Sequence, residues 1–187
     1  MHREITDFLT RVKADAGLGS KPVHHVVEVG SFILDTATGS AREVFEPIAK
    51  HYKGIDHRAG PGVDVVSIAH LYTPAMPADV AVCCQVLEHD PYWPLTLIHL
   101  VWLVRSGGVV VVTCAGPGYV AHELDTSPGY VPGESAYYRN VSAAEVEQAL
   151  RAGARYIDLD VVEIHAVEQR NRYGMLDTLV WARFAVP

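Results

Sequence analysis

The chain has 187 residues, of which 49% are hydrophobic and 20% are charged, a balance typical of a folded domain with a sizeable core. Its formal net charge of -7 provides no basic field for the backbone of a nucleic acid, so a nucleic-acid partner is not expected. The sequence has no N-terminal signal pattern and no run near the ~20 apolar residues of a membrane span, which predicts a protein without a membrane segment. Its three cysteines lie inside apolar runs, which is typical of reduced thiols and predicts a cytoplasmic protein.

The chain begins with an amphipathic segment. Apolar residues at helical spacing predict a helix from Ile5 to Ala16, in a lead-in of residues 1–22. Residues 23–187 are then expected to form the domain itself. Within it, residues 119–140 follow no period and are rich in Gly, Pro and Tyr, which predicts a lid-like loop.

A strand–helix–strand unit follows the lead-in. A short, mostly apolar run predicts a buried strand from Val23 to Val29. Thr38 or Ser40 can cap the next helix, which is expected to end near His51. A second strand then covers Tyr52 to Asp56 and ends in an acid.

The rest of the chain continues with alternating strands and helices. A capping box formed by Ser142 and Glu145 predicts a helix through Leu150, and Gly153 is expected to end it. The remaining expected elements are strands at Val63 to Ile68, Asp79 to Val86 and Val109 to Thr113, a helix at Pro94 to Val104, and a closing hairpin of Ile157 to Val167 with Leu176 to Ala185.

This element order predicts an α/β fold. Alternating strands and helices need a parallel sheet with helices on both faces, and such sheets bind ligands beyond the carboxyl ends of their strands. The final two strands have no helix between them, so the last one must run antiparallel. We therefore expect a Rossmann-like, seven-stranded, mostly parallel sheet with an antiparallel last strand.

The first strand–helix–strand unit also predicts a nucleoside site. Glu28, Val29 and Gly30 end the first strand, where a glycine lets the backbone approach a ligand at a helix N-terminus. Asp56 at the end of the second strand is placed to accept hydrogen bonds from ribose hydroxyls. The alternative for Asp56 is a strand-end acid that only caps a turn.

Four segments between about Val23 and Leu150 resemble the class I S-adenosylmethionine-dependent methyltransferases of the type 11 group. They are Val26 to Ser31, Tyr52 to Asp56 with Gly60 to Val66, Asp79 to His89, and Leu103 to Gly108 with the strand that follows. Tyr137 to Ser142 also resembles a Tyr-Trp-Arg-Phe-Thr stretch that some of these enzymes carry.

The resemblance implies S-adenosylmethionine as cofactor. Glu28 and Gly30 would lie against its methionine part, Asp56 would bind the ribose, and His57 or Arg58 would border the adenine. The full implied cofactor set is Glu28, Gly30, Ser31, Asp56, His57, Arg58, Ala69, Gln85, Val86 and Leu87.

Three positions depart from the family pattern, and the first of them makes its first motif degenerate. Phe32 stands where the family usually has a second glycine, so this loop could cover the cofactor site. Ile68 stands where an aspartate usually accepts the adenine amino group, so that hydrogen bond must be lost or replaced. Ser106 replaces the usual proline of a later turn, a minor change.

Two histidines are candidate catalytic bases. His89 suits a general base because of its ordinary pKa, but a pocket-wall role is the alternative, since methyl transfer often needs only proximity and alignment. His122, in the lid-like loop, is the second candidate, with a plain surface histidine as its alternative. The candidate substrate-binding residues are Glu88, Tyr137, Tyr138 and Arg139, and the last three could instead anchor their segment on the sheet. The ten histidines show no ligand spacing, so no metal site is expected.

Two functions therefore stay open. The first is methyl transfer from S-adenosylmethionine to a small-molecule or exposed polar acceptor. The second is a catalytically inactive methyltransferase-like module for binding or assembly, which Phe32 and Ile68 favour. A nicotinamide oxidoreductase fits less well because the loop lacks the glycine spacing of the dinucleotide fingerprint. The oligomeric state is not predicted.

Overall fold

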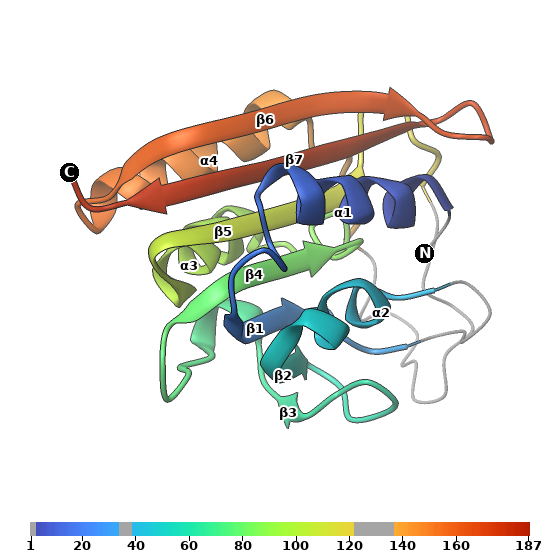
Figure 1. The fold of residues 1–187 in the computed structure, drawn as a ribbon. Coiled ribbons are helices and arrows are strands. Elements are labelled where there is room, and N and C mark those ends of the chain that lie inside the picture. Colours follow the sequence, from blue (N-terminus) through green and yellow to red (C-terminus); the bar gives the residue numbers. More distant parts are fainter. Residues whose placement is uncertain (1–2, 34–38, 122–136) are drawn as a thin grey trace.

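A computed structural model describes residues 3–33, 39–121 and 137–187 (Figure 1). Its strands are β1 (Val23–Val29), β2 (Ala49–Asp56), β3 (Val65–Val66), β4 (Ala78–Cys84), β5 (Val104–Ala115), β6 (Asp160–Arg170) and β7 (Leu176–Ala185). Its α-helices are α1 (Arg3–Asp15), α2 (Ala41–Phe45), α3 (Trp93–Leu103) and α4 (Ala143–Tyr156), and two 3-10 turns are η2 (Glu46–Ile48) and η3 (Ala69–Leu71).

The strands form one seven-stranded sheet in the order β3-β2-β1-β4-β5-β7-β6. The pairs among β1 to β5 are all parallel, whereas β7 runs antiparallel to both β5 and β6. This arrangement confirms the α/β fold with an antiparallel last strand. Because β1 and β4 are neighbours at the centre, their carboxyl ends open onto one region.

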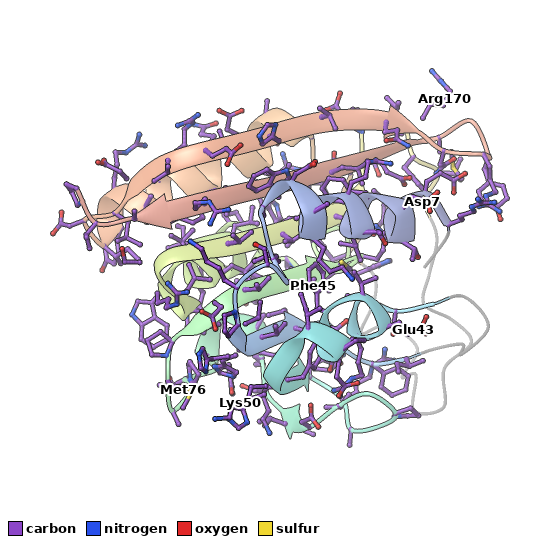
Figure 2. All side chains as sticks on the ribbon, viewed as in Figure 1. Asp7, Glu43, Phe45, Lys50, Met76 and Arg170 are labelled. Atoms are coloured by element: carbon purple, nitrogen blue, oxygen red, sulfur yellow. The ribbon has the colours of Figure 1, made fainter. Side chains whose placement is uncertain are left out.

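Helices cover both faces of the sheet (Figure 1). On one face, α1 and α2 pack Ile5, Leu9 and Phe45 against the sheet in a core cluster of their own. Figure 2 places Phe45 there, and its side chain is fully buried. On the other face, α3 and α4 pack against the second and larger cluster. The first helix thus contributes to the core.

Two expected helix ends are wrong, each for a local reason. The helix expected to reach His51 ends at Phe45 and continues only as η2, because Pro47 lacks an N–H and cannot extend an α-helix. The helix expected to end at Gly153 runs on to Tyr156. A Cβ at Gly153 would lie 3.1 Å from the Cα of Ile98, so this glycine permits close packing of α4 on α3.

The middle of the sheet is simpler than the expected alternation. The third strand has only two residues, a loop joins β2 to β3, and only η3 intervenes before β4. The buried strand expected to reach Val86 ends at Cys84, where Gln85 takes a positive φ of 57° and turns the chain. Among the described residues, no helix is both long and apolar enough to cross a membrane.

Candidate functional site

A cavity of about 370 Å³ opens beside the carboxyl ends of β1, β2 and β4. Its volume lies within the usual range of small-molecule sites, about 300–1,000 Å³. Most of its wall is apolar, and a few polar side chains lie along the strand ends. Eight of the residues expected at a site line it: Gly30, Asp56, His57, Arg58, Ala69, Gln85, Val86 and His89.

The floor of the cavity depends on the turns after β1 and β4. Gly30 has a φ of 76°, and a Cβ there would stand only 2.0 Å from the Cγ2 of Val86. Any side chain would therefore force the two turns apart. The backbone N–H groups of Gly30 and Ser31 both donate to the carbonyl of Ile55, at 2.9 and 3.1 Å, and fix the turn to the end of β2.

Asp56 is the main anion of the cavity. Its carboxylate accepts hydrogen bonds from the backbone N–H of Arg58 at 3.0 Å and of Phe32 at 3.3 Å, and the Nδ1 of His57 lies 3.1 Å from it. Burial raises the pKa of Asp56, but the contact with His57 and these N–H donors outweigh it, and the pKa falls below its ordinary value. Because its pKa is lowered, Asp56 is ionised near neutral pH. A carboxylate offers about four acceptor positions, so Asp56 can still accept a hydrogen bond from a ligand.

Phe32 and Ile68, which the resemblance to methyltransferases marks as departures, both line the cavity. The ring of Phe32 lies against Gly60, where a Cβ would be 2.1 Å from it, and the Arg58 guanidinium lies 4.7 Å above the ring centroid. Phe32 thus joins the turn after β1 to the loop after β2 as one wall. Ile68 forms part of another wall and is half exposed.

The cavity wall also includes residues that the sequence did not single out as site residues, namely Asp90, Pro91 and Tyr92, which follow His89. Asp90 accepts hydrogen bonds from the backbone N–H of Tyr92 and the hydroxyl of Thr96, at 2.8 and 2.6 Å. It therefore stabilises the turn that leads into α3, and an acid just before an apolar helix is a signal that could have located this wall.

Glu28 does not line the cavity. It is buried with its carboxylate accepting from the Tyr52 hydroxyl at 2.7 Å. The Arg42 guanidinium stacks 4.6 Å from the centroid of the Tyr52 ring and pairs with Asp64 at 2.7 Å. Burial raises the pKa of Glu28 to about 7 despite the hydrogen bond from Tyr52. Glu28 therefore belongs to a polar cluster with Tyr52, Arg42 and Asp64, outside the cavity wall. Ser31 is also buried and outside the cavity wall.

Leu87 and Glu88 are fully buried and do not line the cavity either. The Oε1 of Glu88 accepts from the backbone N–H of Ala115 at 3.3 Å, while its Oε2 has no hydrogen-bond partner among the described residues. Burial raises the pKa of Glu88 to about 7. This carboxyl thus ties the turn after β4 to the end of β5.

The aromatic segment after residue 136 is attached to the same region. Tyr137 packs on the core, and the backbone N–H of Arg139 donates to the carbonyl of Glu88 at 2.9 Å. The Arg139 side chain pairs with Glu145 and lies over the ring of Trp93, so it points to α4 and α3. Only Tyr138 approaches the cavity, with its ring 5.3 Å from that of His89.

His122 lies outside the described residues, and so does most of the expected lid-like loop. Within the described ranges, no three or more His, Cys, Asp or Glu side chains gather as a metal-binding group.

Comparison of the sequence with protein-family models and with curated proteins finds no match. Solved structures do match. The Burkholderia thailandensis 1,6-didemethyltoxoflavin-N1-methyltransferase, solved with bound S-adenosylhomocysteine, has a TM-score of 0.65 and 17% identity over 96% of this chain and 77% of its own. The N-methyltransferase NodS of Bradyrhizobium japonicum WM9, in complex with S-adenosylhomocysteine, has a TM-score of 0.60 and 18% identity. The match covers 100% of this chain and 89% of NodS.

The chain has the class I methyltransferase fold. The same fold is found in the cyclase SpnF, at a TM-score of 0.64 and 15% identity over 97% of this chain and 82% of that one. Identities this low establish the fold and leave the chemistry to be argued from the site.

We expect Glu28→Gln to reduce the pH dependence of stability. The pKa of Glu28 is raised from 4.5 to about 7 in the folded chain, so the folded state holds this proton more tightly than the unfolded state. The free energy of unfolding that this proton contributes is present in full below pH 4.5 and is lost as the pH rises through 7. The loss amounts to at most about 3 kcal/mol. In the glutamine variant the loss that comes from Glu28 is absent, whereas the loss that comes from Glu88 remains.

Urea unfolding between the two pKa values measures this effect. The free energy of unfolding of the wild-type chain should decline more steeply with rising pH than that of Glu28→Gln. Glu43→Gln, at an exposed position of α2, controls for the loss of one surface carboxylate. Parallel curves for wild type and Glu28→Gln would contradict the raised pKa of Glu28.

Proposed function

We propose that this chain binds S-adenosylmethionine and transfers its methyl group to a small-molecule acceptor. The observation that carries the proposal is the cavity at the carboxyl ends of β1, β2 and β4, with Gly30 and Asp56 at two of those ends. In an open parallel sheet this is the place for a nucleoside ligand. The bound S-adenosylhomocysteine of two enzymes with this fold supports the same cofactor.

The residues present fit such a cofactor. The absence of a side chain at Gly30 leaves the backbone turn open to close approach by a ligand. Asp56 is ionised and lies on the wall, as ribose hydroxyls require. The exposed His57 ring contacts one carboxylate oxygen and can rotate away to free it. Ala69 and Val86 supply apolar surface for the base, with Arg58 and Gln85 at its margins.

Ile68 changes how the adenine is held. Its side chain lines the cavity and has no polar atom, so it cannot accept the adenine amino group. Apolar contact with Ile68 and Val86 then replaces the hydrogen bond that an acid would provide. Base recognition in this chain rests on packing, which predicts weaker discrimination among purines.

The cofactor supplies an electrophilic methyl group on a sulfonium sulfur, and the chain orients it toward the acceptor. On transfer of that methyl group, the acceptor oxygen or nitrogen would lose one proton. His89, on the wall with its ring edge against Tyr138, is the group that we assign to take this proton. The aligned cavity supplies the proximity.

The second candidate is a module with this fold that carries no methyl transfer. Phe32 and Ile68 favour this catalytically inactive binding or assembly module, because they line the cavity where the family pattern has a glycine and an aspartate. Cofactor binding separates the two candidates before any acceptor is identified.

Calorimetric titration with S-adenosylmethionine and S-adenosylhomocysteine tests the proposal first. We expect micromolar binding of at least one of them. Asp56→Ala should weaken it about tenfold or more, because it removes charged acceptors from the ribose. Asp15→Ala, which removes an exposed acid at the end of α1, should leave the affinity unchanged. No heat with either compound at millimolar concentration would reject the methyltransferase and favour the second candidate.

His89→Gln tests the proton acceptor. Against a panel of small amines and alcohols, we expect kcat for release of S-adenosylhomocysteine to fall about 100-fold or more, with a smaller change in cofactor Kd. His57→Gln should change the cofactor Kd more than kcat, because the His57 ring contacts Asp56. If His89→Gln keeps the wild-type kcat and pH profile, His89 is a wall residue and alignment alone drives transfer.

A further inference from the structure

Apolar side chains are exposed together on α3 and on the segment that packs against it. Six of them form what we call the α3 patch: Ile68, Leu71, Met76, Tyr92, Leu95 and Trp102, each between 45% and 65% exposed. In Figure 2, Met76 projects from the edge of the molecule below α3. Exposed single apolar residues are ordinary, but a gathered set marks a contact surface.

Contacts between the two segments make the patch continuous. His99 of α3 is hydrogen-bonded through its Nε2 to the carbonyl of Tyr72 at 2.7 Å, and its ring stacks on Trp102 at 5.1 Å. Nearer the start of α3, the rings of His70 and Tyr92 are 5.4 Å apart. The patch therefore runs from the start of α3 to its end.

The patch is built from two uncharged stretches of the chain. Residues 65–78 and residues 91–104 contain no Asp, Glu, Lys or Arg, although the whole chain has 22 acidic and 15 basic residues. Apart from Thr96 and His99, α3 has apolar side chains on every face. A helix that is apolar all round is normally covered on all sides.

We infer that the α3 patch is the contact between two copies of this chain in a two-fold dimer. In such a contact the same surface of each copy meets the other. A charged side chain near the two-fold axis therefore faces the identical charge of the second copy. An uncharged patch avoids this repulsion, whereas the rest of a chain with a net charge of -7 opposes self-association. The same acidic charge disfavours an anionic lipid surface as the occupant.

The size of the patch fits a stable dimer. Half-exposed side chains of this size present about 100 Å² each, so six of them offer roughly 600 Å² of apolar surface. Homodimer interfaces are about 65% apolar, which corresponds to a footprint of roughly 900 Å² per copy. A standard interface needs about 800 Å² per copy.

The dimer also places the second copy beside the cavity. Ile68 and Tyr92 belong both to the patch and to the cavity wall. A copy packed on the patch covers that side of the opening and excludes water from it. This inference stands without the proposed reaction, because it uses only exposure, charge and contacts.

Sedimentation velocity of the full chain tests the inference. We expect the wild type to form a dimer with a micromolar dissociation constant. Leu95→Glu and Leu71→Glu each place two like charges in the contact, so each should raise that constant about tenfold or more. Val162→Glu, at a similarly exposed apolar position on β6, should leave the dimer unchanged. Circular dichroism and the melting temperature of each monomeric variant verify that it is folded.

Mixing variants provides a test that loss of folding cannot imitate. Leu95→Glu and Leu95→Lys should each be impaired alone, while their equimolar mixture should form a heterodimer. A wild-type chain that stays monomeric at about 100 micromolar, where a standard interface is saturated, would overturn the inference. So would a dimer that Val162→Glu breaks and the patch variants do not, which would place the contact at the β6 edge. Binding of the monomer to neutral lipid vesicles, lost in Leu95→Glu, would overturn it in favour of a lipid surface.

Discussion

The candidate site depends on the contact between the turns that follow β1 and β4. Gly30 has a φ of 76° and approaches Val86 so closely that a Cβ would overlap it. The same turn is bonded through two backbone N–H groups to Ile55 at the end of β2. One glycine thus lets three neighbouring strand ends meet around one cavity, and Asp56 reaches the wall because β2 ends in that place.

Two buried carboxyls support these strand ends from behind. Glu28 is held by the Tyr52 hydroxyl, and Glu88 by the backbone N–H of Ala115. Burial raises the pKa of both to about 7, because an ionised carboxylate is costly away from water. At pH 7 each of them is therefore only about half ionised, whereas Asp56, whose pKa is lowered, is fully ionised on the cavity wall. The cavity wall therefore carries an ionised Asp56, with less competing charge beneath it than two fully ionised carboxylates would give.

Strand positions were predictable from the sequence, and side-chain directions were not. The bounds of β1 and β7 are those expected from their apolar runs. Glu28 was expected against the ligand, but successive side chains of a strand alternate between faces, and Glu28 shares its face with the hydroxyl of Tyr52. The period of a strand says which residues share a face and leaves open which face meets the cavity. Gly153 was misjudged similarly, because the turn signal of a glycine and its use for close helix packing look alike in sequence.

Ile68 connects the cavity with the outer surface of α3. In a dimer formed through the α3 patch, an aspartate at this position would be buried close to its own copy, and burying an unpaired charge costs several kcal/mol. An isoleucine adds apolar area to the contact and apolar wall to the cavity. Under the two proposals together, one side chain would serve both the ligand and the second copy, which accounts for an apolar residue at this position. On this argument, the departure at position 68 reflects dimer formation and is compatible with a working cofactor site.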